Sequence, residues 1–433
     1  MKPVKIGLLG LGTVGAGTVN VLRRNALEIS RRAGREILIY RAAARGTWAC
    51  DTTDIPVTED GFEVVNDPEV DIVVELIGGE EPAKQLILTA LANGKHVVTA
   101  NKALIAKHGN EIFAKASEMG LMVAFEPAVA GGIPIIKALR EGLTGNKIEW
   151  VAGIINGTCN FILTEMRDKG RDFDAVLQEA QAKGYAEANP TFDVEGIDSA
   201  HKLTILASIA FGIPLQFDKI YIEGIGGVTR MDVEYAEELH YRIKLLGLAR
   251  RTEQGVELRV HPTLIPERRL IANVDGVMNA VLVKGDAVGP TLYYGAGAGA
   301  EPTASAVVAD IVDVVRTLTS DPENRVPHLA FQPQSISDIP ILPIDAVLTA
   351  YYLRLSAEDK PGVLADVTRI LANHQISIEA ILQKEPLTGE SYLPIIMLTQ
   401  KTQEREMKAA VAEIEALASI DKPVKLIRME TLG

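Results

Sequence analysis

The segment that decides the fold is VKIGLLGLGTVG at residues 4–15. Residues 4–9 form an apolar run that predicts a buried strand, and residues 14–30 have helical spacing. Between them, one glycine permits a tight turn, a second lets the backbone approach a pyrophosphate, and a third lets helix and strand pack closely. The helix N-terminus offers N–H groups to the phosphates. The predicted dinucleotide contacts are Gly10, Leu11, Gly12, Thr13, Val14 and Gly15.

The alternation of strand and helix continues through the first 130 residues. Further strands are predicted at 37–43, 71–77, 96–99 and 121–125, with helices at 82–93 and 103–119. Strands that alternate with helices imply a parallel sheet covered on both faces. We therefore expect a Rossmann-type, doubly wound α/β domain over 1–130, to which a helix within 301–331 returns.

The pattern changes after this domain. Residues 131–300 mix strand-like runs (149–156, 221–224, 255–261, 276–283) with helical ones (173–183, 199–211), which predicts an α+β catalytic and dimerisation domain. Residues 332–348 are rich in proline at first and read as a linker. Residues 349–433 then predict a compact βαββα segment of ferredoxin-like type, with strands at 350–356, 376–383 and 392–399 and helices at 362–374 and 403–417.

Composition narrows the class of protein. The 433 residues suggest two to four domains, and 47% hydrophobic with 23% charged residues is ordinary for a globular protein. The net charge of −13 disfavours a nucleic-acid partner. No apolar run reaches the ~18 residues that a membrane span needs. The two cysteines favour a reducing compartment, so we expect the cytoplasm, or an equivalent compartment after removal of a transit segment.

The ribose end of the nucleotide site is less clear. The second strand runs into YRAAARG at 40–46, which has no acid before Asp51. Arg45 could pair bidentately with a 2′-phosphate, which favours NADP over NAD, although NAD stays open and Arg45 could also be a solvated surface residue.

Long segments in one order carry a family resemblance. They are GLGTVG at 10–15, VTANKALIA at 98–106, EPAVAGGIPII at 126–136, KGYAEANPTFDVEGIDSAHKL at 183–203 and GAGAGAEPTASAV at 295–307. Together they resemble homoserine dehydrogenase with a C-terminal ACT domain. The resemblance implies NAD(P)-dependent interconversion of L-homoserine and L-aspartate 4-semialdehyde, in the biosynthesis of threonine, methionine and isoleucine.

Such an enzyme needs a group that exchanges the hydroxyl proton as hydride moves. Lys202 is our first candidate, because it follows Asp198 by four residues on one helix face and precedes buried apolar residues. Burial would lower its pKa, and Asp198 would oppose that shift, so we expect the geometry to limit their contact. A purely structural ion pair is the alternative. The resemblance makes Lys102, after the 96–99 strand, a second lysine at the nicotinamide and substrate, and the sequence does not decide which one moves the proton.

The resemblance assigns further residues. Glu187 and Asp198 would bind the substrate ammonium, and Asp198 could also bind its hydroxyl. Asp193 belongs to the same acidic loop, and Thr158 and Gly157 would lie near the substrate and the nicotinamide. Cofactor contacts would come from Thr99, Lys102, Gly184 and Gly299.

A monovalent cation, Na⁺ or K⁺, is also implied by the resemblance. Its ligands would be the Glu126 carboxylate and the backbone carbonyls of Val129, Gly131 and Ile133, which are the hard oxygen donors that such an ion prefers.

The DKPGVL stretch at 359–364 resembles the ACT signature. We expect Asp359 to cap the following helix and Pro361 to open it. Threonine is the expected effector, with Asp359, Gly362 and Asn373 as contacts, and a purely structural dimerisation role is the alternative. Both the central sheet and this module offer pairing surfaces, so a homodimer or homotetramer is expected.

Two rival functions remain open. A phosphorylating aldehyde dehydrogenase would use Cys159 as its nucleophile, but no partner histidine is identifiable. A sensor would bind both ligands without turnover.

Overall fold

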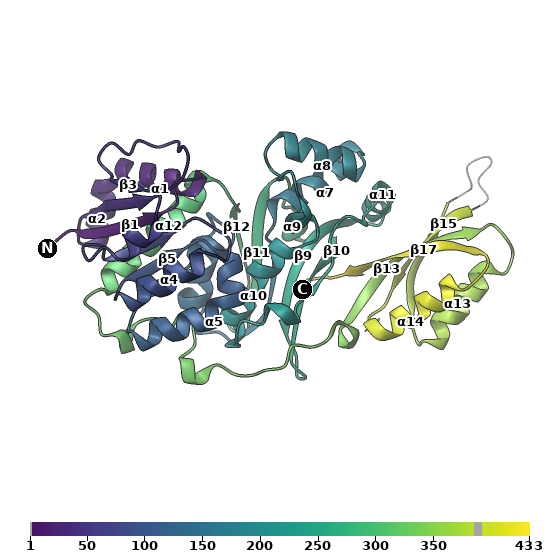
Figure 1. Cartoon of the computed structure of the whole chain (residues 1–433). Coiled ribbons are helices and arrows are strands. Elements are labelled where there is room, and N and C mark those ends of the chain that lie inside the picture. Colours follow the sequence, from purple (N-terminus) through teal and green to yellow (C-terminus); the bar gives the residue numbers. More distant parts are fainter. Residues whose placement is uncertain (1, 385–391) are drawn as a thin grey trace. The chain divides into compact units, whose positions relative to one another are not determined.

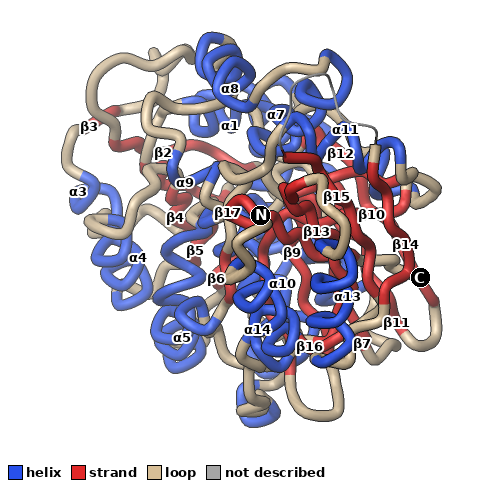
Figure 2. The backbone as a smooth tube through the Cα atoms, turned by 90° about the vertical axis from the view of Figure 1, so that its right-hand side faces the viewer, coloured by secondary structure: helices blue, strands red, loops and turns tan. Residues whose placement is uncertain are grey.

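The computed structural model describes residues 2–384 and 392–433. These residues form two compact units. The first unit comprises residues 1–157, 198–220 and 277–339, and the second comprises 158–197, 221–276 and 340–433. Figures 1 and 2 show helices and strands in both. Among the described residues, no helix has the length and apolar character that crossing a membrane requires.

The first unit contains a six-stranded parallel sheet in the order β3-β2-β1-β4-β5-β6. This order reverses beside β1, as in the Rossmann fold, and ligands bind where it reverses, at the carboxyl ends of the strands. The predicted α/β fold class is therefore confirmed. The strands are β1 (Val4–Leu9), β2 (Ile37–Ala43), β3 (Val57–Thr58), β4 (Ile72–Glu75), β5 (His96–Thr99) and β6 (Val123–Ala124).

Helices cover this sheet. The predicted helix over 14–30 is instead two helices, α1 (Thr13–Arg24) and α2 (Ala26–Ala33), separated at Asn25. Asparagine favours helix ends over interiors because its side chain competes for backbone hydrogen bonds. The others are α3 (Gly61–Val65), α4 (Ala83–Ala92) and α5 (Lys102–Glu118).

Helix α12 (Ala300–Thr317) packs on α1 although it lies far along the chain. A Cβ at Gly17 of α1 would lie 2.5 Å from the carbonyl oxygen of Ala300, so only glycine permits this approach. Val307 and Ile311 of α12 join the buried cluster that includes Ile6 of β1.

The first unit also holds an antiparallel group of strands. β11 (Met278–Gly285) pairs with β7 (Ile148–Ile154) on one side and with β12 (Gly289–Ala296) on the other. The sequence did not indicate β12. The buried helix α10 (Ile197–Phe211) belongs here, and short helical turns lie at Glu126–Ala128, Ile135–Lys137, Ala138–Gly142 and Phe217–Lys219.

The second unit contains a long hairpin. β9 (Tyr241–Arg251) and β10 (Val256–Pro266) are antiparallel, and the short β8 (Tyr221–Ile222) runs parallel to β10. The strand β9 was not predicted. The helices are α7 (Gly157–Lys169), α8 (Phe173–Ala182), α9 (Thr191–Val194) and α11 (Arg230–Glu238).

The C-terminal part of the second unit is βαββαβ, so the predicted βαββα segment lacked its last strand. The sheet order β17-β13-β15-β14 is antiparallel and ferredoxin-like. β17 also pairs with β10, in parallel, through Thr263 and Arg428. The elements are β13 (Leu348–Glu358), α13 (Val363–Asn373), β14 (Ile378–Gln383), β15 (Tyr392–Thr399), the short β16 (Thr402–Gln403), α14 (Glu404–Glu415) and β17 (Ile420–Met429).

One expectation in this module is wrong. Asp359 does not cap α13: the N-cap is Gly362, whose φ of +100° is the left-handed conformation, and it offers no side-chain cap. Helix α13 begins at Val363, so Pro361 does not open it. The left-handed conformation of Gly362 changes the direction of the chain just before the helix begins. Asp359 is exposed in the preceding loop.

Candidate active site

The glycine turn after β1 has the geometry that its sequence predicts. A Cβ at Gly10, where φ is +98°, would lie 2.9 Å from the Leu76 backbone, and a Cβ at Gly15 would lie 2.1 Å from the carbonyl oxygen of Gly10. By contrast, apart from Gly12 and the residues next to it in the chain, no heavy atom of the described residues lies within 4 Å of a Cβ built on Gly12. Two glycines thus permit close packing and the middle one leaves open space at the start of α1, where a phosphate can approach.

A cavity of about 380 Å³ runs along this turn. Arg45, Trp48 and Glu59 lie on its wall, together with Gly10, Leu11 and Gly12. The predicted Arg45 thus faces the same hollow as the glycine turn, whereas Thr13, Val14 and Gly15 form the first turn of α1. Trp48 and Glu59 were not predicted, because nothing in their local sequence indicates a ligand.

Thr99 ends β5 and is fully buried. Its hydroxyl donates a hydrogen bond of 2.6 Å to Oε2 of Glu75, which ends the neighbouring β4. Glu75 also accepts the backbone N–H groups of Ile77 and Gly78. Burial raises the pKa of Glu75 despite these bonds. Glu75 was missed, although an acid inside the apolar run DIVVELI at 71–77 was a usable signal.

Three charged side chains meet in the first unit. Oδ2 of Asp198 lies 2.7 Å from Nζ of Lys202, and Oδ1 lies 2.9 Å from Nζ of Lys102. Lys202 also donates to the carbonyl of Ile155 at 2.8 Å, and Asn156 donates to Oδ2 of Asp198 at 2.9 Å. The structure therefore joins both predicted lysines to one carboxylate, at the start of α5 and of α10.

The electrostatics of this cluster follow from its burial. The side chains of Asp198 and Lys202 are only 4% and 10% exposed, whereas that of Lys102 is 35% exposed. Burial disfavours the charged carboxylate, but Lys202 and Lys102 outweigh it and hold the pKa of Asp198 well below its usual range. The expectation that geometry limits contact between Asp198 and Lys202 is wrong, because the two are directly hydrogen-bonded.

Cofactor and substrate residues of the resemblance lie in both units. In the first unit, Gly299 precedes α12 with φ +128°, and a Cβ at Gly157 would lie 2.8 Å from the carbonyl oxygen of Val277. In the second unit, Gly184 has φ +73° in the exposed turn that follows α8.

The acidic loop, residues 187–196, belongs to the second unit. Glu187 is exposed, while Asp193 is half-buried within α9. The carbonyl of Asp193 accepts a bond from Sγ of Cys159 at 3.2 Å, and Thr158 donates to the carbonyl of Tyr185 at 2.6 Å. The first turn of α7 is thus bonded to the loop through Cys159 and to the residue two positions before the loop through Thr158.

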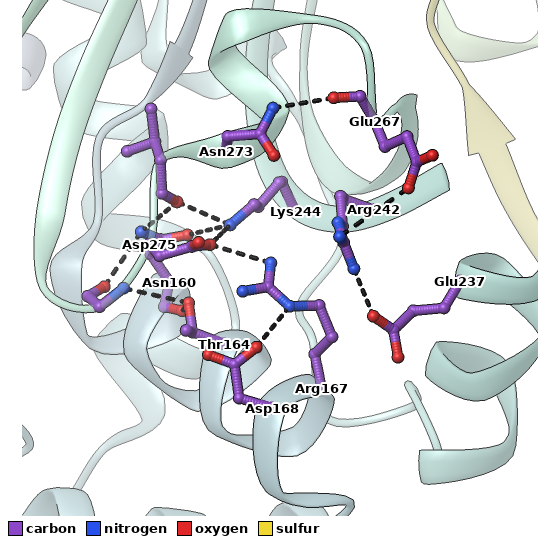
Figure 3. Close-up of polar contacts among 12 residues, drawn as sticks. Asn160, Thr164, Arg167, Asp168, Glu237, Arg242, Lys244, Glu267, Asn273 and Asp275 are labelled. Atoms are coloured by element: carbon purple, nitrogen blue, oxygen red, sulfur yellow. Dashed lines mark hydrogen bonds and ion pairs between the residues drawn. The ribbon is translucent and has the colours of Figure 1, made fainter. Parts of the chain in front are cut away.

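Asn160 anchors the same end of α7 and was not singled out from the sequence. Its amide nitrogen donates to the carbonyls of Val274 and Gly276, and its oxygen accepts a bond from Nζ of Lys244 (Figure 3). Lys244 is 1% exposed and also bonds Asp275. Burial lowers the pKa of Lys244 to about 8. No local pattern marks Lys244 as a partner, because the contact joins α7 to β9.

Glu126 follows β6 and is 2% exposed. Its two oxygens accept the backbone N–H groups of Ile136 and Lys137, and its own N–H donates to Asp310 at 2.8 Å. Burial and the neighbouring Asp310 raise the pKa of Glu126 to about 7. A buried carboxylate that is costly to ionise suits a cation at its side. Among the described residues, however, no group of three or more His, Cys, Asp or Glu side chains could hold a metal ion, so backbone oxygens would have to supply the other ligands.

Comparisons with known proteins agree along the chain. The sequence profile of homoserine dehydrogenase matches residues 134–312, that of the homoserine dehydrogenase NAD-binding domain matches 10–126, and that of the ACT domain matches 351–419. Homoserine dehydrogenase of Pseudomonas aeruginosa is 67% identical over all of both chains, and that of Neisseria gonorrhoeae is 57% identical over all of both.

Solved structures give the same answer. The crystal structure of a homoserine dehydrogenase from Thiobacillus denitrificans has a TM-score of 0.95 and 68% identity, covering 100% of this chain and 99% of that one. A hyperthermophilic archaeal homoserine dehydrogenase in complex with NADPH has a TM-score of 0.63 at 26% identity, covering 74% of this chain and 100% of that one. With its glycine turn, its paired lysines and its C-terminal module, the chain belongs to the homoserine dehydrogenase family of oxidoreductases.

Proposed function

We propose that the cluster of Lys102, Asp198 and Lys202 carries the interconversion of L-homoserine and L-aspartate 4-semialdehyde. One observation supports this most directly: a single buried carboxylate holds two lysines where β5 runs into α5. The carboxyl edge of a doubly wound sheet is where a nicotinamide is expected to bind.

The chemistry needs one hydride and one proton. NAD(P)⁺ held beside the glycine turn would supply the acceptor for the hydride of the homoserine carbinol carbon. We assign the hydroxyl proton to Lys202, which is the more buried amine, and give Lys102 the substrate-facing role. Asp198 holds both amines in place and limits their motion. Positioning of this kind lowers the barrier because the reacting groups are already oriented.

Substrate selectivity would come from charge. For the ammonium of homoserine we propose the carboxylates of Asp198 in the first unit and of Glu187 in the second unit, where Asp193 belongs to the same loop. Thr158 and Gly157, at the start of α7, would line the substrate, since α7 is fixed by the Asn160 network. Gly184 and Gly299 would let backbone approach the cofactor.

For the cofactor we propose NADP ahead of NAD. Arg45 lies on the wall of the cavity beside the glycine turn, where a 2′-phosphate would be expected. The archaeal relative is described in complex with NADPH. Thr99 would contact the nicotinamide end through its backbone, because its hydroxyl is bonded to Glu75.

We further propose a monovalent cation, Na⁺ or K⁺, held by Glu126 and the carbonyls of Val129, Gly131 and Ile133. The carbonyl of Ile133 already accepts the N–H of Ile135 at 2.8 Å, which leaves its second lone pair for an ion. A cation here would offset the cost of ionising Glu126.

The ACT module suggests regulation, and we propose threonine as the effector. Gly362 lies at the start of α13 and Asn373 at its exposed end, with Asp359 in the exposed loop before it. We also propose a homodimer or homotetramer. The pairing surfaces would lie on the strand that carries the exposed Ile381 in the ACT module, β14, and on the strand that carries the exposed Tyr294, β12.

We also propose the domain division and location. A nucleotide-binding domain would span 1–130 with 301–331, the catalytic domain 131–300, the linker 332–348 and the ACT domain 349–433. Both cysteines are free thiols, which fits a cytoplasmic protein.

A steady-state assay tests the proposal. Purified protein is mixed with homoserine and either NADP⁺ or NAD⁺, with and without threonine, and with Na⁺ or K⁺ present. We expect turnover with homoserine, a higher kcat/KM with NADP⁺, and inhibition by threonine. Cofactor binding without any turnover would overturn the proposal in favour of a sensor.

A further inference from the structure

We propose that Arg428, on the last strand of the ACT module, is a positioning residue that holds the acidic loop through strand β8. This inference rests on the proposed function, in which Glu187 of that loop binds the substrate ammonium and Asp193 belongs to the same loop. It assigns a physical route by which the C-terminal module sets affinity for homoserine. All the residues of the route lie within the second unit.

The Arg428 guanidinium is almost wholly buried and contacts two separate elements. Toward the catalytic part it donates to Oε2 of Glu223 at 2.6 Å and to the hydroxyl of Tyr221 at 3.1 Å, and it lies over the Tyr221 ring at 4.8 Å. Toward the ACT module it donates to both oxygens of Glu404, one of them at 2.8 Å. Tyr351 donates to the same Glu404 at 2.7 Å. Arg428 therefore joins α14 and β13 of the module to β8.

Strand β8 depends on such side-chain contacts because its backbone pairing is short. It pairs with β10 only through Tyr221–Arg259 and Ile222–Val260, and Glu223 then donates its N–H to the carbonyl of Val260. A strand of this length is marginal by itself. The ion pair of Arg428 with Glu223 and its contact with the Tyr221 ring therefore help to hold β8 in place.

The acidic loop lies directly against the residues after β8. The N–H of Ile225 donates to the carbonyl of Val194 at 2.8 Å. A Cβ at Gly224 would lie 2.4 Å from that carbonyl oxygen and 2.7 Å from Cα of Glu195. Across the loop, a Cβ at Gly196 would lie 3.3 Å from the side chain of Ile222. Because the two backbone segments are in direct contact, a displacement of β8 also displaces the segment that carries Asp193.

The two ion pairs of Arg428 differ in how much it costs to break them. Glu404 is fully buried, and Arg428 is its main cationic partner, so the guanidinium cannot leave Glu404 without a large cost. The Glu223 side chain is 32% exposed and can lose the contact more cheaply. When the module shifts, Arg428 therefore follows Glu404, and the Glu223 contact is the one that lengthens. The expected consequence is a weaker hold on homoserine with little change in cofactor affinity.

The test uses the full chain with the variants Glu223→Gln, Arg428→Lys and Arg428→Met. The matched control is Arg354→Met: Arg354 also reaches from the ACT module, but it bonds Asp232 of α11 at 2.6 Å and not β8. We expect Glu223→Gln and Arg428→Met to raise KM for homoserine roughly five- to tenfold, at constant KM for NADP⁺ and with kcat within about twofold, as for a modest coupling. Arg428→Lys should recover part of the loss, the double variant should be no worse than Arg428→Met alone, and the control should keep the wild-type KM.

Each outcome has a separate meaning. If wild-type protein does not turn over homoserine, the proposed function fails. If the wild type is active and Glu223→Gln keeps its KM, the inference is overturned, and an equal KM change in Arg354→Met would overturn it as well. Because Glu223 is partly exposed, its amide variant is expected to fold even if Arg428→Met does not, and near-ultraviolet circular dichroism checks both.

Discussion

Asp198 lies 2.9 Å from Lys102, a residue of a different helix, and its other oxygen is bonded to Lys202. One carboxylate thus balances two cations in a largely buried place. The two lysines together hold the pKa of Asp198 well below its usual range. Because both amines are paired with the same carboxylate, removal of any one of the three side chains is expected to change the charge balance of the other two.

The first prediction separates the two lysines. Lys202→Met should lower kcat by about 10²–10⁴-fold, the usual range for loss of a general acid or base. Lys102→Met should act mainly on KM for homoserine. The measurement is steady-state kinetics of homoserine oxidation across pH, in which Lys202→Met should also lose the acidic limb of the kcat profile, because a general base is inactive when protonated. Equal, small effects of both variants would contradict the assigned roles.

The second prediction concerns the cofactor. Arg45→Ala should lower the affinity for NADP⁺ by about 10–100-fold, because a charge-assisted hydrogen bond is worth about 1.5–3 kcal/mol. The affinity for NAD⁺ should not change. Arg41→Ala is the control, since Arg41 lies on β2, just before the loop that carries Arg45, but pairs with Glu63 and Asp67. Fluorescence titration with both reduced cofactors measures the ratio. An unchanged ratio would show that Arg45 is only a surface residue.

The third prediction tests the rival chemistry. Cys159 is buried and its thiol donates to the carbonyl of Asp193. Cys159→Ser keeps a donor there, so activity with homoserine should stay within about threefold of the wild type, a loss below 1 kcal/mol. A thiol nucleophile would instead make this substitution abolish turnover, and a phosphate-dependent reaction would then be found in the wild type.

The fourth prediction links cation binding to pH. Burial and Asp310 raise the pKa of Glu126 to about 7, and a bound cation favours its ionised form. Affinity for K⁺ or Na⁺ should therefore rise as pH increases from 6 to 8, which is measured as a larger increase in Tm with salt at pH 8. Choline chloride controls for ionic strength. Glu126→Gln should remove the pH dependence, and persistence of that dependence would refute the site.

The fifth prediction concerns acid stability. Burial, and next Lys107, lower the pKa of His201 to about 4, and its ring stacks on Phe217 at 4.2 Å. Below pH 6.5 the unfolded chain binds a proton that the folded chain excludes, so stability falls as pH falls from 6.5 to 4. His201→Phe keeps the stacking but cannot titrate. As pH falls from 6.5 to 4, the free energy of unfolding of the wild type should therefore decrease more steeply than that of His201→Phe. The two slopes should differ by up to about 1.4 kcal/mol per pH unit.

Urea unfolding at pH 4.5, 5.5 and 6.5 measures these slopes. Parallel slopes for the wild type and His201→Phe would show that His201 titrates normally in the folded protein.

Local pattern predicted most of the nucleotide-binding sheet. The bounds of β1, β2 and β5 were predicted to the residue, because each is a short apolar run between turn residues, a pattern that is typical of a buried strand. The strand β17 was missed because Pro423 and alternating charges interrupt its pattern. It is nevertheless a strand, since β13 pairs along it. Tertiary pairing here overrides local propensity.

The site shows the same division. The Asp198–Lys202 pair is visible as a four-residue spacing on one helix, so the sequence indicated it. The bond from Asp198 to Lys102 and the bond from Thr99 to Glu75 join separate elements, and no local signal specifies such contacts. The wrong expectation about Asp198 and Lys202 came from treating the carboxylate as the partner of one lysine, when it serves two.

The parallel pairing of β10 with β17 has a consequence for synthesis. Thr263 and Leu264 of β10 pair with Arg428 and Met429, which leave the ribosome long after β10 itself. Until then this part of β10 presents unsatisfied N–H and carbonyl groups, a template for pairing with another nascent chain. We therefore expect the hairpin of β9 and β10 to complete its pairing only after the C-terminal module has been translated. A chain that ends before β17 is expected to aggregate rather than fold to a smaller enzyme.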